Sequence, residues 1–168
     1  MMRPLYKHGM SPLQLQMLLE MYTNPLARDV DIANKLYASV STVSYTTAQL
    51  GLHTQSRVQL YHMLGYIELP DVMPEGGSAM VNNTLRAMQH APSGSLRHLA
   101  EIAGYTTHTM TMTMKYTYNY FGMPMSETRN RSRHAFYAHM GWFDTERLAR
   151  DAKMQYDAIQ EMSHARTI

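Results

Sequence analysis

The sequence contains no cysteine, and none of its apolar runs approaches 18 residues. Without thiols the chain forms no disulfide bond and no thiolate metal site, which agrees with a reducing compartment. The first eight residues lack the apolar segment of a signal peptide, and no run is long enough to span a bilayer. We therefore expect a cytoplasmic protein with no membrane partner.

Motifs for catalysis and cofactor binding are also missing, because there is no P-loop, no Gly-x-Ser-x-Gly and no Gly-x-Gly-x-x-Gly. Nine histidines invite a metal site, but His134 and His139 are five positions apart and do not share a helical face. The seventeen methionines occur at helical spacing, which is more typical of core packing than of a copper or heme site. We expect no enzyme, no metal and no cofactor.

Charge is low and unevenly distributed. The formal net charge is +2. Residues 84–143 carry six basic against two acidic side chains, whereas residues 1–70 carry five against four and the tail from Asp144 four against five. A positive central segment agrees with a surface that faces phosphates, and ordinary scatter of solvated charge is the alternative.

One pattern occurs twice along the chain. Residues 32–43 correspond to residues 99–110, 67 positions later, and each segment reads as a short amphipathic helix, a tight turn and a run that opens with hydroxyl residues. Leu50-Gly51-Leu52 corresponds to Phe121-Gly122-Met123 at an offset of 71, so the second copy holds four more residues, about one helical turn. A helix–turn–helix that occurs twice indicates two DNA-reading units, since one unit covers only a few base pairs.

Capping and spacing signals predict an all-α fold of two tandem four-helix units. The first helix is expected to begin after Ser11, with Pro12 in its first turn, and to end at Asn24-Pro25. A Pro- and Gly-rich linker over 69–79 separates a first helix-turn-helix unit, 10–68, from a second, 80–143. The remaining segment, 144–168, is expected to form a C-terminal helix capped by Thr145.

The segment 109–118 alternates threonine with methionine or tyrosine, a pattern typical of a half-buried strand. In a helix, Met110, Met114, Tyr118 and Phe121 would form one apolar stripe. We favour the helix, because the flanking pattern repeats and a lone strand would have no partner. Thr111, Thr113 and Lys115 would then point away from the core.

Several segments resemble the LuxR/GerE-type DNA-binding domain. That family shows a Ser-Pro or Thr-Pro helix start, an Ile-Ala-x-x-Leu helix, a Thr-Val start to the recognition helix, a Leu-Gly-Val end and an arginine shortly beyond. The matching segments here are Ser11-Pro12-Leu13-Gln14, Ile32-Ala33-Asn34-Lys35-Leu36, Ser41-Thr42-Val43, Leu50-Gly51-Leu52 and Arg57-Val58-Gln59-Leu60. The resemblance implies a four-helix unit whose third helix enters the major groove.

The two copies depart from the family in different ways. Only six residues separate Val43 from Leu50 in the first copy, four fewer than the family spacing. The second copy has ten residues between Met110 and Phe121, which is the family spacing, but it has Met in place of Val and Phe-Gly-Met in place of Leu-Gly-Val.

A recognition helix offers hydrogen-bonding side chains to base edges, with phosphate-binding groups around it. The candidate base contacts are Ser41, Thr42, Ser44, Tyr45 and Thr47 in the first copy and Thr107, His108, Thr109, Thr111, Thr113 and Lys115 in the second. The candidate phosphate contacts are Arg129, Arg131 and Arg133 and, as the resemblance implies, Arg57. Capping and turn formation are the alternative for the hydroxyl residues, and a solvated helix surface is the alternative for the three arginines.

These features predict a sequence-specific transcription regulator that binds double-stranded DNA with two helix–turn–helix units, in the cytoplasm of a prokaryotic or phage-infected cell. One alternative is a module that binds RNA polymerase or another regulator without DNA. Another is a viral DNA-packaging or replication-initiation factor. The tail helix, 145–163, would either form a homodimer or dock on its own core.

Overall fold

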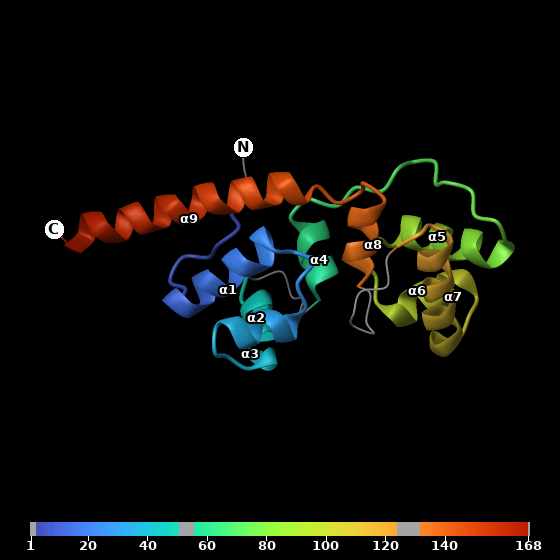
Figure 1. The fold of residues 1–168 in the computed structure, drawn as a ribbon, viewed down its shortest axis with the longest axis horizontal. Coiled ribbons are helices and arrows are strands. Elements are labelled where there is room, and N and C mark those ends of the chain that lie inside the picture. The colour runs from blue at the N-terminus through green and yellow to red at the C-terminus, as the bar shows by residue number, and fades with distance from the viewer. Residues whose placement is uncertain (1–2, 51–55, 124–131, 168) are drawn as a thin grey trace. The chain divides into compact units, whose positions relative to one another are not determined.

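The computed structural model describes residues 3–50, 56–123 and 132–167, with side chains up to residue 164 (Figure 1). Regular structure in these ranges is helical, apart from one isolated antiparallel bridge between Ile67 and Phe143. The predicted all-α class is confirmed. Contacts divide the chain into two compact units: unit 1 consists of Met1–Tyr66 with Asp144–Ile168, and unit 2 consists of Ile67–Phe143.

The first helix of unit 1 begins with the capping box that the sequence predicts at Ser11. The Ser11 hydroxyl accepts a hydrogen bond from the Gln14 backbone N–H, and the Gln14 side chain accepts one from the Ser11 N–H, which forms a capping box. The helices described in unit 1 are α1 (Pro12–Thr23), α2 (Asp29–Lys35), α3 (Val40–Ala48), α4 (Arg57–Met63) and α9 (Thr145–Thr167).

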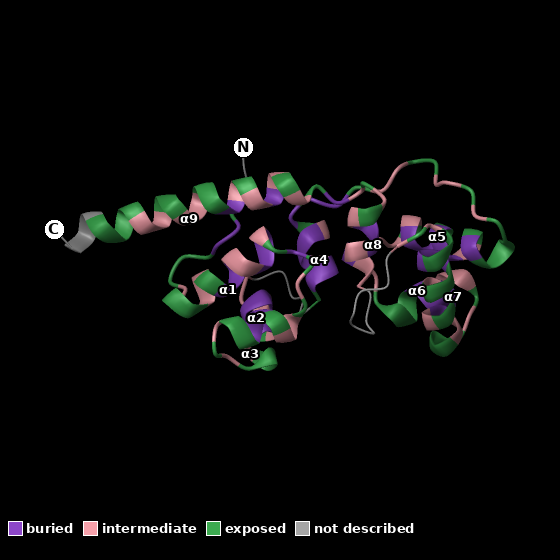
Figure 2. Ribbon diagram, in the orientation of Figure 1, coloured by how far each residue is buried: buried purple, intermediate pink, exposed green. Residues whose placement is uncertain are grey.

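The C-terminal helix α9 packs against α1 (Figure 1). Leu148 and Ala152 on α9 are fully buried, and the ring centres of Tyr156 and Tyr6 lie 6.2 Å apart. The tail helix therefore docks on the first unit along this stretch. Further along α9 burial ends, and Met162 is 60% exposed (Figure 2).

The start of α9 differs from the prediction. Asp144, and not Thr145, caps the helix, because its carboxylate accepts a hydrogen bond of 3.1 Å from the Arg147 backbone N–H. Asp144 also accepts at its backbone carbonyl from the Leu148 N–H, so it occupies the position directly before the first helical residue. A carboxylate at this position also interacts favourably with the helix dipole.

Unit 2 is built around a small apolar core. Ala87, Leu99, Ala100 and Met110 form its centre, and they come from three consecutive helices. The helices described in unit 2 are α5 (Ala79–His90), α6 (Leu96–Ala103), α7 (Thr107–Tyr120) and α8 (Arg133–His139). The ambiguous segment 109–118 lies within α7, so the prediction of a helix there is confirmed.

The segment predicted as a linker has no helix over 69–78, but it is not detached from unit 2. The Gln89 side chain on α5 donates hydrogen bonds to the backbone carbonyls of Pro70 and Asp71. The Glu68 N–H donates to the Trp142 carbonyl at 2.9 Å.

Within the described ranges, no helix combines the length and the apolar character that a bilayer crossing requires.

Candidate nucleic-acid interface

In unit 2, α6 and α7 form a helix–turn–helix with a three-residue turn. Gly104 adopts a left-handed conformation, with φ of +77°, and ends α6. The Tyr105 N–H donates to the Ala100 carbonyl at 2.9 Å. The Thr106 hydroxyl then accepts from the Thr109 N–H and caps α7. A short glycine-containing turn between two packed helices is the geometry of a helix–turn–helix.

The same hydrogen bonds occur 67 positions earlier, between α2 and α3 of unit 1. Tyr37 takes the left-handed position, with φ of 54°, the Ala38 N–H donates to the Ala33 carbonyl at 2.8 Å, and the Ser39 hydroxyl accepts from the Thr42 N–H. The two helices that follow differ in length, because α3 has nine residues and α7 has fourteen.

One side of α7 faces solvent, and we call its exposed residues beyond Thr107 the outer face of α7 (Figure 2). These residues combine a cation, an imidazole, an amide, two phenols and a thioether. They are His108, Met112, Lys115, Tyr116, Asn119 and Tyr120. Side chains of this kind can donate to and accept from base edges and can contact the methyl group of thymine.

The orientation of Thr113 was predicted wrongly. Its side chain is 1% exposed, and its hydroxyl donates to the Met110 carbonyl at 3.0 Å. Thr113 follows the buried Met110 by three positions and precedes the buried Thr117 by four, so all three lie on one helical face. Thr111 is half-exposed, and its hydroxyl donates to the Thr107 carbonyl at 3.0 Å.

The remaining candidate base contacts on α7 lie on its solvent-facing part. Thr107, His108 and Lys115 are exposed, and Thr109 is half-buried at the helix start. Tyr116, Asn119 and Tyr120 form the C-terminal part of this surface and were not among the predicted base contacts. Steps of four residues from His108 reach Tyr116 and Tyr120, and one such step from Lys115 reaches Asn119, so helical spacing was the signal that could have identified them.

The first-copy candidates are split between surface and core. On α3, Ser41 and Tyr45 are exposed, while Thr42 and Ser44 are half-buried. Thr47 is buried, and its hydroxyl donates to the Val43 carbonyl at 3.1 Å, so its assignment as a base contact was wrong.

Arg57 was expected to contact phosphate, but it is 6% exposed in unit 1. Its guanidinium donates to the carbonyls of Pro25, at 2.9 Å, and Ala27. It also donates to the Tyr61 hydroxyl at 2.7 Å and lies 3.5 Å from an oxygen of Asp29. The prediction was wrong because hydrogen bonds to the α1–α2 connection hold this side chain inside unit 1, so it is not exposed to a nucleic acid.

Tyr61 completes this buried cluster. Its hydroxyl donates to the Met21 carbonyl at 2.6 Å. Burial raises the pKa of Tyr61, so the phenol stays protonated at neutral pH and can act as this donor.

Unit 2 contains a related pair, 76 positions later. Arg133 is half-buried and donates to the Pro92 carbonyl at 3.1 Å, and the Tyr137 hydroxyl donates to the same oxygen at 2.7 Å. The shared spacing, Ser-Arg-x-x-x-Tyr, was a sequence signal for arginines at the start of α4 and α8 that bond to backbone carbonyls of their own unit. Arg129 and Arg131 lie outside the described residues.

The cations near the two helix–turn–helix motifs are placed differently. In unit 1, Lys35 pairs with Glu20 and Arg28 with Asp31, both at 2.9 Å, and α3 carries no charged residue. In unit 2, Arg86, Arg97 and Lys115 are all exposed. The Arg97–Glu101 pair measures 3.5 Å between highly exposed groups and contributes little.

Comparison of this chain with protein-family models, curated proteins and solved structures finds no match. The likeness to the LuxR/GerE type therefore rests on the sequence segments quoted above. The proposed function rests on the geometry of the described residues.

Proposed function

We propose that the protein is a transcription regulator that binds double-stranded DNA with sequence preference, and that the outer face of α7 is its main reading surface. The observation that carries this proposal is the helix–turn–helix of unit 2, in which a capped fourteen-residue helix presents polar side chains to solvent. Such a helix is about 21 Å long and fits a major groove about 12 Å wide.

The proposal gives unit 1 the smaller share of binding. Its third helix is shorter and uncharged, and the cations on the adjoining residues are engaged in ion pairs. Arg57 is buried in unit 1 and is not available to contact DNA. We therefore expect a bipartite footprint with unequal halves, in which contacts made by unit 2 dominate the affinity.

Salt dependence of binding tests this proposal. A protein that neutralises several phosphates loses affinity steeply as salt rises, with a log–log slope of roughly −0.9 per phosphate contact. Titration of a selected duplex at several salt concentrations measures the salt slope, and footprinting measures the two halves of the protected site. Binding that does not respond to salt contradicts the proposal.

A second candidate function is the binding of a transcription regulator or RNA polymerase without DNA. Exposed apolar side chains around the helix–turn–helix of unit 1 favour it, because Tyr37 is 99% exposed and Val40 and Tyr45 are also exposed. Co-purification of such a partner, with no shift of any DNA, supports this candidate. Loss of the partner with Tyr45→Ser, and retention with the α7 variant Tyr116→Ser, would assign the contact to unit 1.

A further inference from the structure

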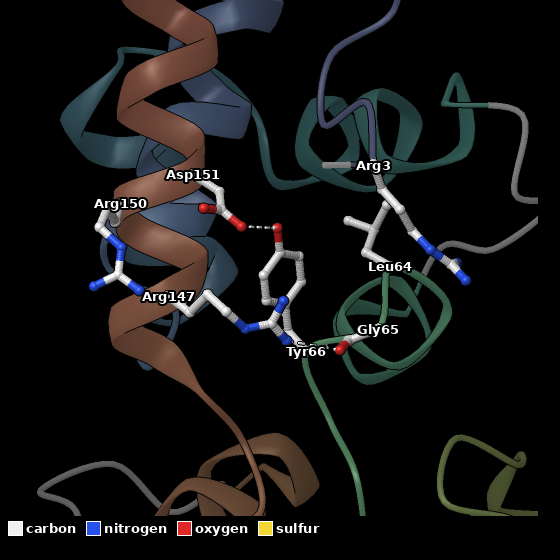
Figure 3. Close-up of a pocket in the computed structure, with 7 residues that line it drawn as sticks. All are labelled: Arg3, Leu64, Gly65, Tyr66, Arg147, Arg150 and Asp151. Carbon is white, nitrogen blue, oxygen red and sulfur yellow. Dashed lines mark hydrogen bonds between the residues drawn. The ribbon is translucent and has the colours of Figure 1, made fainter. Parts of the chain in front are cut away.

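Three arginines line a surface pocket of about 510 Å³ in unit 1. Arg3 comes from the N-terminal segment, Leu64–Tyr66 close the C-terminal end of α4, and Arg147 and Arg150 come from the first turns of α9 (Figure 3). The predicted DNA-contacting residues do not include these arginines.

Arg147 is held in a fixed position at the centre of this pocket. Its guanidinium carbon lies 4.4 Å from the centre of the Tyr66 ring, and its Nη2 donates to the Gly65 carbonyl at 2.9 Å. Its Nε donates to Asp144 at 3.4 Å. These two hydrogen bonds use two of the five N–H donors of a guanidinium. A ligand would therefore meet a pre-ordered donor group, which lowers the entropic cost of binding.

The lining of the pocket is positively charged. It contains three arginines and one carboxylate, Asp151, which accepts a hydrogen bond of 2.7 Å from the Tyr66 hydroxyl (Figure 3). Neither Arg3 nor Arg150 takes part in the ion pairs found among the described residues. Arg3 donates to the Met63 carbonyl, and that bond leaves its charge without a counter-ion.

We propose that this pocket binds a phosphate group, which Arg147 contacts first and Arg3 and Arg150 then clamp. A planar guanidinium matches the oxygen spacing of phosphate, and Arg147 offers the fixed donor set. Arg3 and Arg150 lie on opposite sides of Arg147 and extend outward, and both are exposed side chains that can turn toward a ligand (Figure 3).

The phosphate has two possible sources with the same chemistry, a backbone phosphodiester of a nucleic acid and free phosphate. In the first case the proposal rests on the proposed function and gives unit 1 a contact outside its helix–turn–helix. In the second case it stands without that function.

NMR of the full chain tests the pocket directly. Inorganic phosphate is titrated at constant ionic strength, with chloride as the balancing ion, while the Arg147 Nε–Hε signal and the Gly65 and Tyr66 amide signals are followed. The variant Arg3→Gln/Arg150→Gln removes two charges from the pocket. The control, Arg86→Gln/Arg97→Gln, removes two exposed charges from unit 2.

We expect saturable shifts in the wild type, about tenfold weaker binding in the pocket variant and unchanged binding in the control. A 12-base-pair duplex of arbitrary sequence forms the second arm. If it moves the same signals, the source is the nucleic-acid backbone, and if only inorganic phosphate does so, the source is free phosphate. The proposal is overturned if neither ligand gives saturable shifts, or if the two variants behave alike. Failure of sequence-specific binding by α7 leaves the phosphate arm unaffected.

Discussion

Arg57 and Tyr61 make unit 1 dependent on a buried polar cluster. A buried guanidinium is tolerated because backbone carbonyls, a phenol and a carboxylate surround it. Removing it leaves the buried Pro25 carbonyl and the half-buried Ala27 carbonyl without these donors, which is more costly than losing an exposed ion pair. The role of this arginine is therefore decided by burial, although its position fits the family pattern.

We expect Arg57→Gln to lower the free energy of unfolding by about 2–4 kcal/mol, because the shorter amide cannot reach both carbonyls. The half-buried equivalent, Arg133→Gln, should cost about 1 kcal/mol. Urea denaturation measures both variants. A change below about 0.5 kcal/mol for Arg57→Gln would contradict the buried role.

Tyr37 is a residue whose backbone conformation is strained in the fold. It is the one non-glycine residue with positive φ among those described, and the corresponding position of unit 2 is Gly104. Because the side chain is exposed, Tyr37→Gly should raise the free energy of unfolding by up to about 1 kcal/mol. The control Tyr37→Ala keeps the strain and should bring no gain. Equal stabilities of the glycine and alanine variants would refute this explanation.

At the level of elements, local chemistry made most of the helices predictable. Hydroxyl caps begin α1, α3 and α7 at Ser11, Ser39 and Thr106, and capping depends only on neighbouring residues. The predicted apolar stripe on α7 does face the core, since Met110 and Tyr118 are buried and Met114 packs against the core of unit 2. Local chemistry did not reveal how far the buried face extends around the helix, because packing in the folded unit also buries the polar Thr113 and Thr117.

A matched pair of threonines tests the orientation of α7. Thr111→Ala should weaken binding to a selected DNA site by at least about fivefold, since this half-exposed side chain lies beside the outer face. Thr113→Val keeps the shape of the buried side chain but removes its hydrogen bond to the Met110 carbonyl, so binding should be unchanged and stability should change by about 1 kcal/mol. Electrophoretic mobility shift and thermal denaturation measure the two effects. The reverse order of binding losses would place Thr113 at the interface.

At the scale of the whole molecule, the chain leaves unit 1 after Tyr66 and returns to it at Asp144. The sequence predicted the C-terminal helix but left its docking partner open, because its narrow apolar stripe also suits a dimer. The contacts that dock α9 on unit 1 join residues far apart in the sequence. The Gln155 side chain accepts a hydrogen bond from the Leu5 N–H, and the Tyr6 hydroxyl donates one to the Ala152 carbonyl. Such pairings depend on the assembled fold.

Truncation tests the dependence of unit 1 on α9. A chain ending at Phe143 loses the buried Leu148 and Ala152, and we expect the melting temperature of unit 1 to fall by more than about 10 °C. A chain ending at Gln160 keeps these contacts and should melt within about 3 °C of the full chain. Circular dichroism follows both. If the shorter chain keeps the full melting temperature, α9 is not part of the core.

Selection from a random pool of double-stranded DNA tests the central claim, that the outer face of α7 reads DNA sequence. Purified protein at physiological salt should enrich a bipartite motif, and the half bound by unit 2 should lose its consensus in the variant Lys115→Gln/Asn119→Ala. Failure of the wild type to enrich any sequence, or an unchanged motif in this variant, would contradict the account.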